Sequence, residues 1–170
     1  EFYDFTQVRP HTNLDKDGVR HLKWPSNEFF YHSATDSPPG MILFVGTEPN
    51  LKWRTYCATI VDMAIRLGVH TVIHVGALLD AVPHAREVCL TGWANNDGLQ
   101  ESLVKLGATS STYQGPSGIS AALMNQCVVK GLNFATLWGH SPHYLQASPN
   151  YKVTYGIVCA IRQLLGLKTN

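Results

Sequence analysis

The residues best suited to chemistry follow apolar runs in this sequence, and two histidines are the most conspicuous of them. His140 and His143 lie three residues apart in WGHSPHY, with Pro142 between them and Tyr144 directly after. Two imidazoles on a loop could bind a metal ion, belong to an active site or make ordinary loop hydrogen bonds. A zinc site needs three or four ligands, and Pro142 interrupts the helix on which an HxxH pair would converge. We therefore predict no metal site and no cofactor, and keep His140, His143 and Tyr144 as candidate ligand-binding residues.

A second group of candidates follows the apolar run 41–46. Glu48 is the carboxylate at the end of this run and is therefore the best candidate for a general base. Asn50 and Arg54 come directly after it and join the candidate ligand-binding residues. We find no second carboxylate in the sequence to act as a partner of Glu48.

Two further stretches could bind an anion. His84 and Arg86 in VPHAR place an imidazole and a guanidinium two residues apart, a pair able to bind a carboxylate or phosphate. The alternative is a loop that Asp80 or Glu87 stabilises. Ser117 in GPSG precedes a predicted helix, where it could cap the helix and leave N–H groups for an anion. The same four residues are equally typical of a plain turn and cap, and no GK[ST] follows to make a P-loop.

Strands and helices must alternate along the chain to position these residues. Continuous apolar runs at 41–46, 71–79 and 133–138 are typical of strands covered on both faces. Apolar residues at helical spacing, each ending at a glycine, predict helices over 51–67, 117–130 and 151–165. This alternation predicts an α/β fold, a three-layer α/β/α sandwich with a mostly parallel sheet, in which 41–76 forms a right-handed parallel βαβ unit.

If the strands are parallel, their carboxyl ends meet at one edge of the sheet, where ligands bind in open α/β folds. The candidates would then share one rim, formed by Glu48, His84, Arg86, Ser117, His140 and His143. Shorter elements complete the expected order: a hairpin with its turn at 15–18, a strand over 28–32, a break at 37–40, a strand over 87–94 and a helix over 96–106.

Length and composition limit the functions that the chain could have. The 170 residues fit one α/β domain, and a formal charge of +1 gives no electrostatic footprint for nucleic acid. No apolar run reaches the ~18 residues of a membrane span, and the start EFYDFTQVRP is neither basic nor apolar enough for a signal peptide. Four widely spaced cysteines without CxxC pairing indicate free thiols, so we expect a cytoplasmic protein.

Several stretches together resemble the proteasome assembly chaperone 2 family, in particular its bacterial members of unassigned function. They are EPNLKWRTYC (48–57), GALLDAVPHAR (76–86), YQGPSGI (113–119) and WGHSPHY (138–144), supported by EFYDFTQVRPH (1–11) and WPSNEFF (24–30). The resemblance implies an α/β/α fold similar to the nucleoside phosphorylase/hydrolase group, and a homo-oligomer. For eukaryotic relatives it implies heterodimeric chaperones that bind proteasome α-subunits without doing chemistry.

The chain departs from this family at its start. Relatives place a further strand and helix before the stretch that EFYDF matches, and a sheet that lacks a central strand exposes unpaired N–H and C=O groups. We expect the native protein to contain this N-terminal strand–helix unit.

Two functions are consistent with these observations. The first is a protein-binding or assembly factor, since the sequence has neither a GxSxG nucleophile elbow nor a glycine-rich phosphate loop. The alternative is a hydrolase or nucleoside-phosphorylase-like enzyme, with Glu48 as base and with His84 and Arg86 holding a small anionic ligand.

Overall fold

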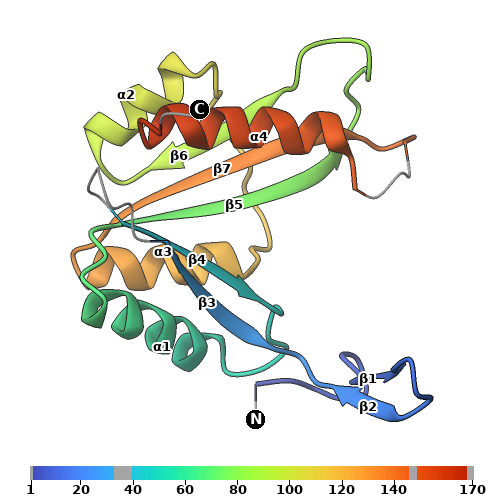
Figure 1. The fold of residues 1–170 in the computed structure, drawn as a ribbon. Coiled ribbons are helices and arrows are strands. Elements are labelled where there is room, and N and C mark those ends of the chain that lie inside the picture. Colours follow the sequence, from blue (N-terminus) through green and yellow to red (C-terminus); the bar gives the residue numbers. More distant parts are fainter. Residues whose placement is uncertain (1, 33–39, 146–148, 168–170) are drawn as a thin grey trace. The chain divides into compact units, whose positions relative to one another are not determined.

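The computed structural model describes residues 2–32, 40–145 and 149–167, and Figure 1 shows the fold. Its secondary structure is mixed α/β, with seven strands and four helices among the described residues. Contacts divide the chain into two compact units, Glu1–Tyr56 and Cys57–Asn170, here called unit 1 and unit 2. The division falls inside the first helix, and each unit is described by itself.

Unit 1 contains the predicted hairpin. Strands β1 (His11–Leu14) and β2 (Arg20–Lys23) pair antiparallel around a turn in which Gly18 has a φ of 76°. The Asp15 carboxylate accepts hydrogen bonds from the backbone N–H groups of Asp17 (3.0 Å) and Val19 (2.9 Å). An aspartate that holds the backbone beyond it, followed by a glycine at positive φ, is the turn chemistry that the sequence predicted.

The other two strands of unit 1 confirm the predicted strand positions but not their pairing. Strands β3 (Asn27–His32) and β4 (Met41–Gly46) form a two-stranded antiparallel sheet. The parallel βαβ unit over 41–76 is therefore wrong, because β4 pairs with β3 and not with the strand that follows the helix. Burial on both faces is also wrong, since Leu43 is 55% exposed and Val45 53% exposed. The predicted break at 37–40 falls largely on residues outside the described ranges.

Helix α1 (Trp53–Arg66) begins in unit 1 and continues into unit 2, as the spacing of apolar residues over 51–67 predicted. Lys52 precedes it with a φ of 54°, and the Lys52 carbonyl accepts a hydrogen bond from the Tyr56 N–H at 3.0 Å. Gly68 follows the helix with a φ of 71°. Only glycine adopts this left-handed conformation without strain, which explains why the helix stops there.

Unit 2 is built on a three-stranded sheet with the order β5-β7-β6. Strands β5 (Thr71–Asp80) and β7 (Asn133–Pro142) pair in parallel over their full lengths, as expected. Strand β6 (Leu90–Ala94) pairs with β7 antiparallel, so this sheet is mixed. The strand predicted over 87–94 begins only at Leu90, and β7 extends four residues beyond the predicted end at 138.

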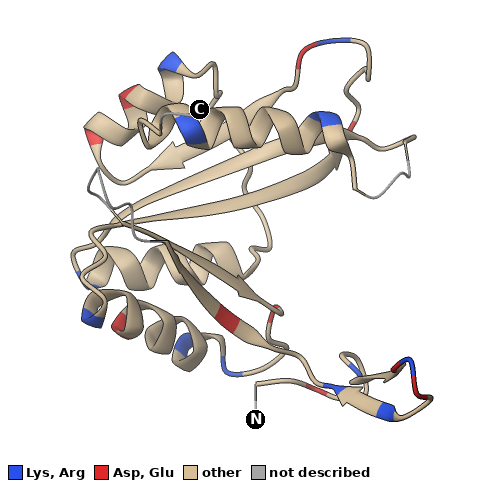
Figure 2. Cartoon of the chain, viewed as in Figure 1, with Lys and Arg blue, Asp and Glu red and all other residues tan. Residues whose placement is uncertain are grey.

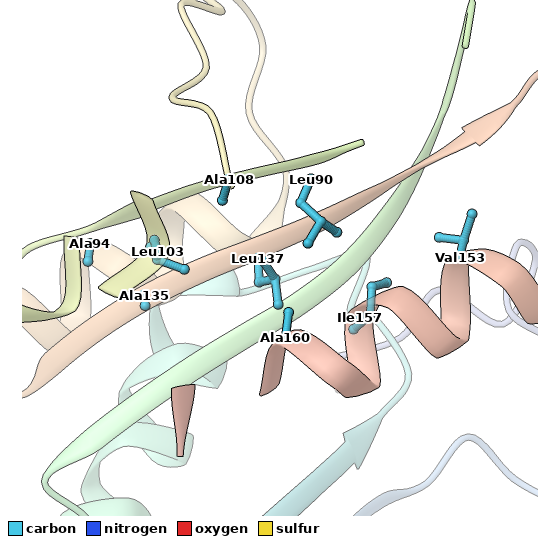
Figure 3. Packing of buried hydrophobic residues seen from close by; sticks show 9 residues of the cluster. All are labelled: Leu90, Ala94, Leu103, Ala108, Ala135, Leu137, Val153, Ile157 and Ala160. Atoms are coloured by element: carbon cyan, nitrogen blue, oxygen red, sulfur yellow. The ribbon is translucent and has the colours of Figure 1, made fainter. Parts of the chain in front are cut away.

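Side chains of β7 alternate between two hydrophobic clusters. Ala135 and Leu137 pack with the inner face of α4 (Tyr151–Leu164) and with Leu103 of α2 (Asp97–Lys105), as Figure 3 shows. Phe134 packs in a second cluster with α1 and with Cys127 of α3 (Ile119–Val129). Helices therefore cover both faces of the central strand, because successive strand residues point to opposite faces.

Two asparagines begin helices of unit 2. The side chain of Asn96 accepts a hydrogen bond from the Leu99 N–H at the start of α2, and that of Asn150 accepts one from the Val153 N–H at the start of α4. Both are typical N-caps. None of the helices in the described residues is long and apolar enough to cross a membrane.

Charged residues are distributed over all parts of the molecule. Figure 2 shows Lys, Arg, Asp and Glu on helices, loops and the hairpin, without an extended patch of one sign in this view. This distribution agrees with the formal charge of +1.

Candidate functional site

A hollow of about 530 Å³ in unit 1, here the unit 1 hollow, contains two of the candidate residues. It is lined by Asp4, Gln7, Val8, Thr47, Glu48, Pro49, Asn50, Leu51 and Trp53. Its walls come from the first residues of the chain and from the segment that joins β4 to α1. Glu48 and Asn50 therefore share a hollow, whereas Arg54 is an exposed residue in the first turn of α1 and is not among the lining residues.

Asn50 connects the two walls of the unit 1 hollow. Its side-chain oxygen accepts a hydrogen bond from the Asp4 N–H (3.1 Å), and its side-chain amide donates to Gln7 (3.4 Å). The amide N–H groups of Asn50 and Leu51 both donate to the Phe2 carbonyl. Asn50 therefore holds together the two segments that line the hollow. The sequence alone does not distinguish this structural role from a role in ligand binding.

Asp4 supplies the second carboxylate of this hollow, which sequence reasoning missed. Its carboxylate accepts hydrogen bonds from the Thr6 hydroxyl (2.6 Å) and the Thr6 backbone N–H (2.9 Å). These bonds favour the charged form and lower the pKa of Asp4 below its ordinary value. Asp4 lies far from Glu48 along the chain, and no local motif in the sequence connects the two residues.

A second hollow, here the unit 2 hollow, has a volume of about 240 Å³ and contains His84 and Arg86. Its other lining residues come from the loop after β5, the end of β7 and the start of α4: Val82, Pro83, Glu87, Val88, Cys89, His140, Pro142, Leu145, Asn150, Lys152 and Val153. The prediction that His84 and Arg86 lie beyond the carboxyl end of a strand is confirmed, since β5 ends at Asp80 and pairs in parallel with β7.

Lys152 holds the loop of the unit 2 hollow in place. Its ammonium group donates hydrogen bonds to the backbone carbonyls of His84 (2.7 Å) and Arg86 (2.5 Å). Sequence reasoning did not select Lys152, because a lysine in the first turn of an amphipathic helix has no local feature that identifies it. Asp80 also contributes, as the predicted alternative had it, because its carboxylate accepts a hydrogen bond from the Ala81 N–H at the start of the loop (2.7 Å).

Tyr144 holds the same loop from the other end. Its hydroxyl accepts a hydrogen bond from the His84 backbone N–H (2.8 Å) and lies 3.0 Å from His84 Nδ1. The Tyr144 ring also stands edge-on to the rings of His84 and His143, with centroids 5.9 and 5.5 Å apart. Tyr144 therefore brings together His84 and His143, two of the six residues of the predicted rim. The premise of that single rim is wrong, because β4, which precedes Glu48, is not part of the β5-β7-β6 sheet.

His140 lies in strand β7, so the expectation that it belongs to a loop is wrong. Its Nδ1 is 2.7 Å from the Asp80 carboxylate and its Nε2 is 3.1 Å from the Thr91 hydroxyl. The His140 side chain is 11% exposed, and both ring nitrogens are occupied within the sheet. The hydrogen bond from His140 is the largest cause that lowers the pKa of Asp80 below its ordinary value; the Ala81 N–H also contributes.

His143 follows the strand in a turn. Its backbone N–H donates to the Asp80 carbonyl (3.0 Å), and its Nδ1 lies 3.2 Å from the same oxygen. His140 therefore contacts the carboxylate of Asp80, and His143 contacts its backbone carbonyl. These contacts join the end of β7 to the end of β5. No group of three or more metal-ligating side chains is present in the described part of the chain.

Ser117 is not at the position that sequence predicted for it. The N-cap of α3 is Gly118, and the helix has no side-chain cap hydrogen bond. Ser117 is exposed and is not among the residues that line the unit 2 hollow. A helix capped by Ser117 would begin at residue 118, but α3 begins at Ile119. The predicted anion site therefore lacks the Ser117 cap.

The chain is similar in sequence and in fold to known proteins. The model of the PAC2 family matches residues 1–170. The chain belongs to the PAC2 family. A PAC2 family protein from Streptomyces avermitilis has 31% sequence identity and a TM-score of 0.87, and the match covers 99% of this chain and 71% of that one.

Two further structures that are similar to this chain are named for a relation to the proteasome. The structure described as a proteasome-assembly chaperone homologue of Mycobacterium tuberculosis has 32% identity and a TM-score of 0.87, with 99% of this chain and 70% of that chain covered. PbaB, an archaeal proteasome activator from Pyrococcus furiosus, has 18% identity and a TM-score of 0.72 over 94% of this chain and 69% of that chain, which shows a shared fold. No curated protein matches.

Proposed function

We propose that this PAC2 family protein is a protein-binding assembly factor whose partners are proteasome subunits, and that it acts without chemistry of its own. The observation that carries the proposal is the 32% identity over 99% of the chain to a proteasome-assembly chaperone homologue, together with a TM-score of 0.87. The resemblance of the sequence to chaperones of proteasome α-subunits supports the same partner class.

Exposed hydrophobic side chains support a role in protein binding. On α4, Tyr151 is 78% exposed and Tyr155 is 72% exposed, and Val158 continues the same face at helical spacing. On β3 and β4, Phe30 and Leu43 face each other across the sheet and both are exposed. Apolar surface of this kind marks interaction sites, and tyrosine is enriched where proteins bind one another.

The proposal also covers the architecture, the oligomeric state and the cellular location of the protein. We infer that the native protein is a single α/β domain with a three-layer α/β/α sandwich like that of the nucleoside phosphorylase/hydrolase group, that it forms a homo-oligomer and that it is cytoplasmic. The matched relatives are longer than this chain, which spans 71% and 70% of the first two. This difference supports an additional strand and helix in the native protein.

The test is complex formation with purified proteasome α-subunits of the same organism. We expect the native full-length protein to form a complex of defined stoichiometry by native mass spectrometry and to raise the rate at which α- and β-subunits assemble. Tyr155→Glu introduces a negative charge on the exposed face of α4, and Gln163→Glu, which introduces the same charge at an exposed position of α4 away from that face, is its matched control. Absence of any complex with the unmodified protein, and an unchanged assembly rate, would refute the proposal.

A hydrolase-like activity is the second candidate, and the unit 1 hollow favours it. Its volume of about 530 Å³ lies in the ~300–1,000 Å³ range of small-molecule sites, and two carboxylates, Asp4 and Glu48, line it. In a thermal-shift screen of nucleosides and carboxylates, a ligand of this hollow would raise the melting temperature of the native protein but not of Glu48→Gln. An equal shift in both proteins would remove Glu48 from this role.

A further inference from the structure

We propose that the unit 2 hollow binds the C-terminal residue of a partner protein, taking its apolar side chain and its free α-carboxylate together. The proposal deepens the assembly-factor function and rests on it for the choice of a protein chain as the occupant. Its carrying observation is that an apolar wall and two cationic side chains, Arg86 and Lys152, meet in one small hollow.

The apolar wall comes from three parts of unit 2. Val82 and Val88 belong to the loop after β5, Pro142 ends β7, and the buried Val153 belongs to the first turn of α4. Val88 packs closely on α4, because a Cβ built on Gly156 would lie 3.0–3.1 Å from its side-chain carbons. An apolar side chain that enters the hollow would therefore contact packed hydrophobic atoms and lose its contact with water, which favours binding.

The charged residues of the hollow favour an anion. His84, Arg86 and Lys152 line it, and Glu87 is the single acidic residue among the described lining residues. Within the described ranges, the Arg86 guanidinium forms no ion pair, so its donors are available for a carboxylate. A planar guanidinium can bind both oxygens of a carboxylate at once, and the start of α4 adds the positive end of a helix dipole.

The size of the hollow selects among anionic ligands. At about 240 Å³ it is smaller than the ~300–1,000 Å³ sites that enclose drug-sized ligands. A whole nucleotide would not fit inside it, and inorganic phosphate would leave the apolar wall without a partner. The last residue of a polypeptide combines the two required chemistries, and capture of a terminal carboxylate is a recurrent mode of peptide recognition.

The test uses fluorescence anisotropy with an N-terminally fluoresceinated peptide, Gly-Ser-Gly-Ser-Ala-Leu, with a free C-terminal carboxylate. We expect saturable binding that weakens at least about tenfold when the same peptide is amidated at its C-terminus, since one charge-assisted hydrogen bond is lost. Arg86→Glu should weaken binding of the free acid by a similar factor and leave the weak binding of the amide unchanged.

The matched control is Arg66→Glu, which makes the same charge change at an exposed residue in the last turn of α1, outside the hollow. We expect Arg66→Glu to retain the affinity of the unmodified protein for the free acid. Circular dichroism verifies that both variants are folded, which the exposure of both arginines leads us to expect.

Three results of the anisotropy measurements would overturn the proposal. They are equal binding of acid and amide, no binding of either peptide at millimolar concentration, and an equal loss of affinity in the two arginine variants.

In competition, N-acetyl-leucine should displace the peptide at lower concentration than inorganic phosphate. The reverse order would identify a plain anion site and overturn the assignment to a chain terminus. Complex formation with proteasome subunits but no peptide binding refutes this inference alone, whereas peptide binding without any such complex refutes the proposed function.

Discussion

Strands β4 and β7 are both rich in apolar residues, yet only β7 is buried. Phe134, Ala135 and Leu137 of β7 are fully buried, while Leu43 and Val45 of β4 are more than half exposed. β7 pairs with a strand on each side and has helices on both faces, whereas β4 pairs with β3 alone among the described strands. The number of neighbouring elements, and not the composition of the strand, determines which apolar strand is buried and which stays exposed.

The largest effect should come from emptying the centre of β7. Phe134→Ala is expected to lower the free energy of unfolding by about 3–5 kcal/mol, because it removes a fully buried aromatic ring from a packed cluster. Phe30→Ala in β3 removes the same atoms from a half-exposed position and should cost less than about 1 kcal/mol. Urea unfolding measures both, and equal losses would contradict the contrast between the two strands.

Adding one methyl group to β7 should have the next largest effect. A Cβ at Gly139 would lie 2.6 Å from the Val153 side chain and 2.8 Å from that of Ile157, so Gly139→Ala must separate α4 from the sheet at a cost of about 1–3 kcal/mol. The matched control is Gly98→Ala in α2, where the nearest atom to the added Cβ is Asn96 Oδ1 at 3.3 Å and the change in stability should stay below about 1 kcal/mol. Thermal unfolding should therefore show a larger decrease in melting temperature for Gly139→Ala than for Gly98→Ala, and equal decreases would contradict this packing.

A smaller effect concerns acid stability at the ends of β5 and β7. Folding lowers the pKa of Asp80 below its ordinary value of 3.8, chiefly through the hydrogen bond from His140. The contribution of this carboxylate to stability is therefore complete above the unfolded value near ~3.9 and is lost as the pH falls through the lower folded pKa. In His140→Gln, carboxyl NMR titration should find the pKa of Asp80 raised toward 3.8; an unchanged pKa would show that His140 is not the main cause.

The smallest effect is the pattern of thiol reactivity. Burial raises the pKa of Cys127 to about 11 and also raises that of Cys57, while Cys89 is exposed. Only the thiolate is nucleophilic, so iodoacetamide at pH 8 should alkylate Cys89 first and leave Cys57 and Cys127 unmodified until urea unfolds the protein. Peptide mass spectrometry measures the order, and early modification of Cys127 would show that the cluster around Phe134 opens in the native state.

The helices could be predicted from the sequence because their signals are local. Apolar spacing and a glycine stop located α1 and α4 to within two residues, and the helix predicted over 96–106 contains α2. The hairpin of unit 1 followed from Asp15 and Gly18 for the same reason. In each case the residues that determine the element lie within or beside it.

The pairing of strands and the composition of the site could not be predicted, because they depend on residues distant in sequence. The apolar run 41–46 carries no information on whether its neighbour is parallel or antiparallel. Pro142 suggested a loop after 138, yet β7 continues to Pro142 because β5 pairs with it as far as Asp80. Asp4 and Lys152 were missed because each reaches a hollow whose other residues lie elsewhere in the chain.

The ammonium group of Lys152 has a consequence for how the unit 2 hollow would admit a ligand. Because it already fixes the carbonyls of His84 and Arg86, the loop has lost its conformational freedom during folding. An incoming group would meet a preorganised wall and would not bear the entropy of ordering it, which favours affinity for a small ligand. Acetylation of Lys152 would remove this positive charge. The loop would then become ordered only when a ligand binds, and the free energy of binding would include the entropic cost of ordering it.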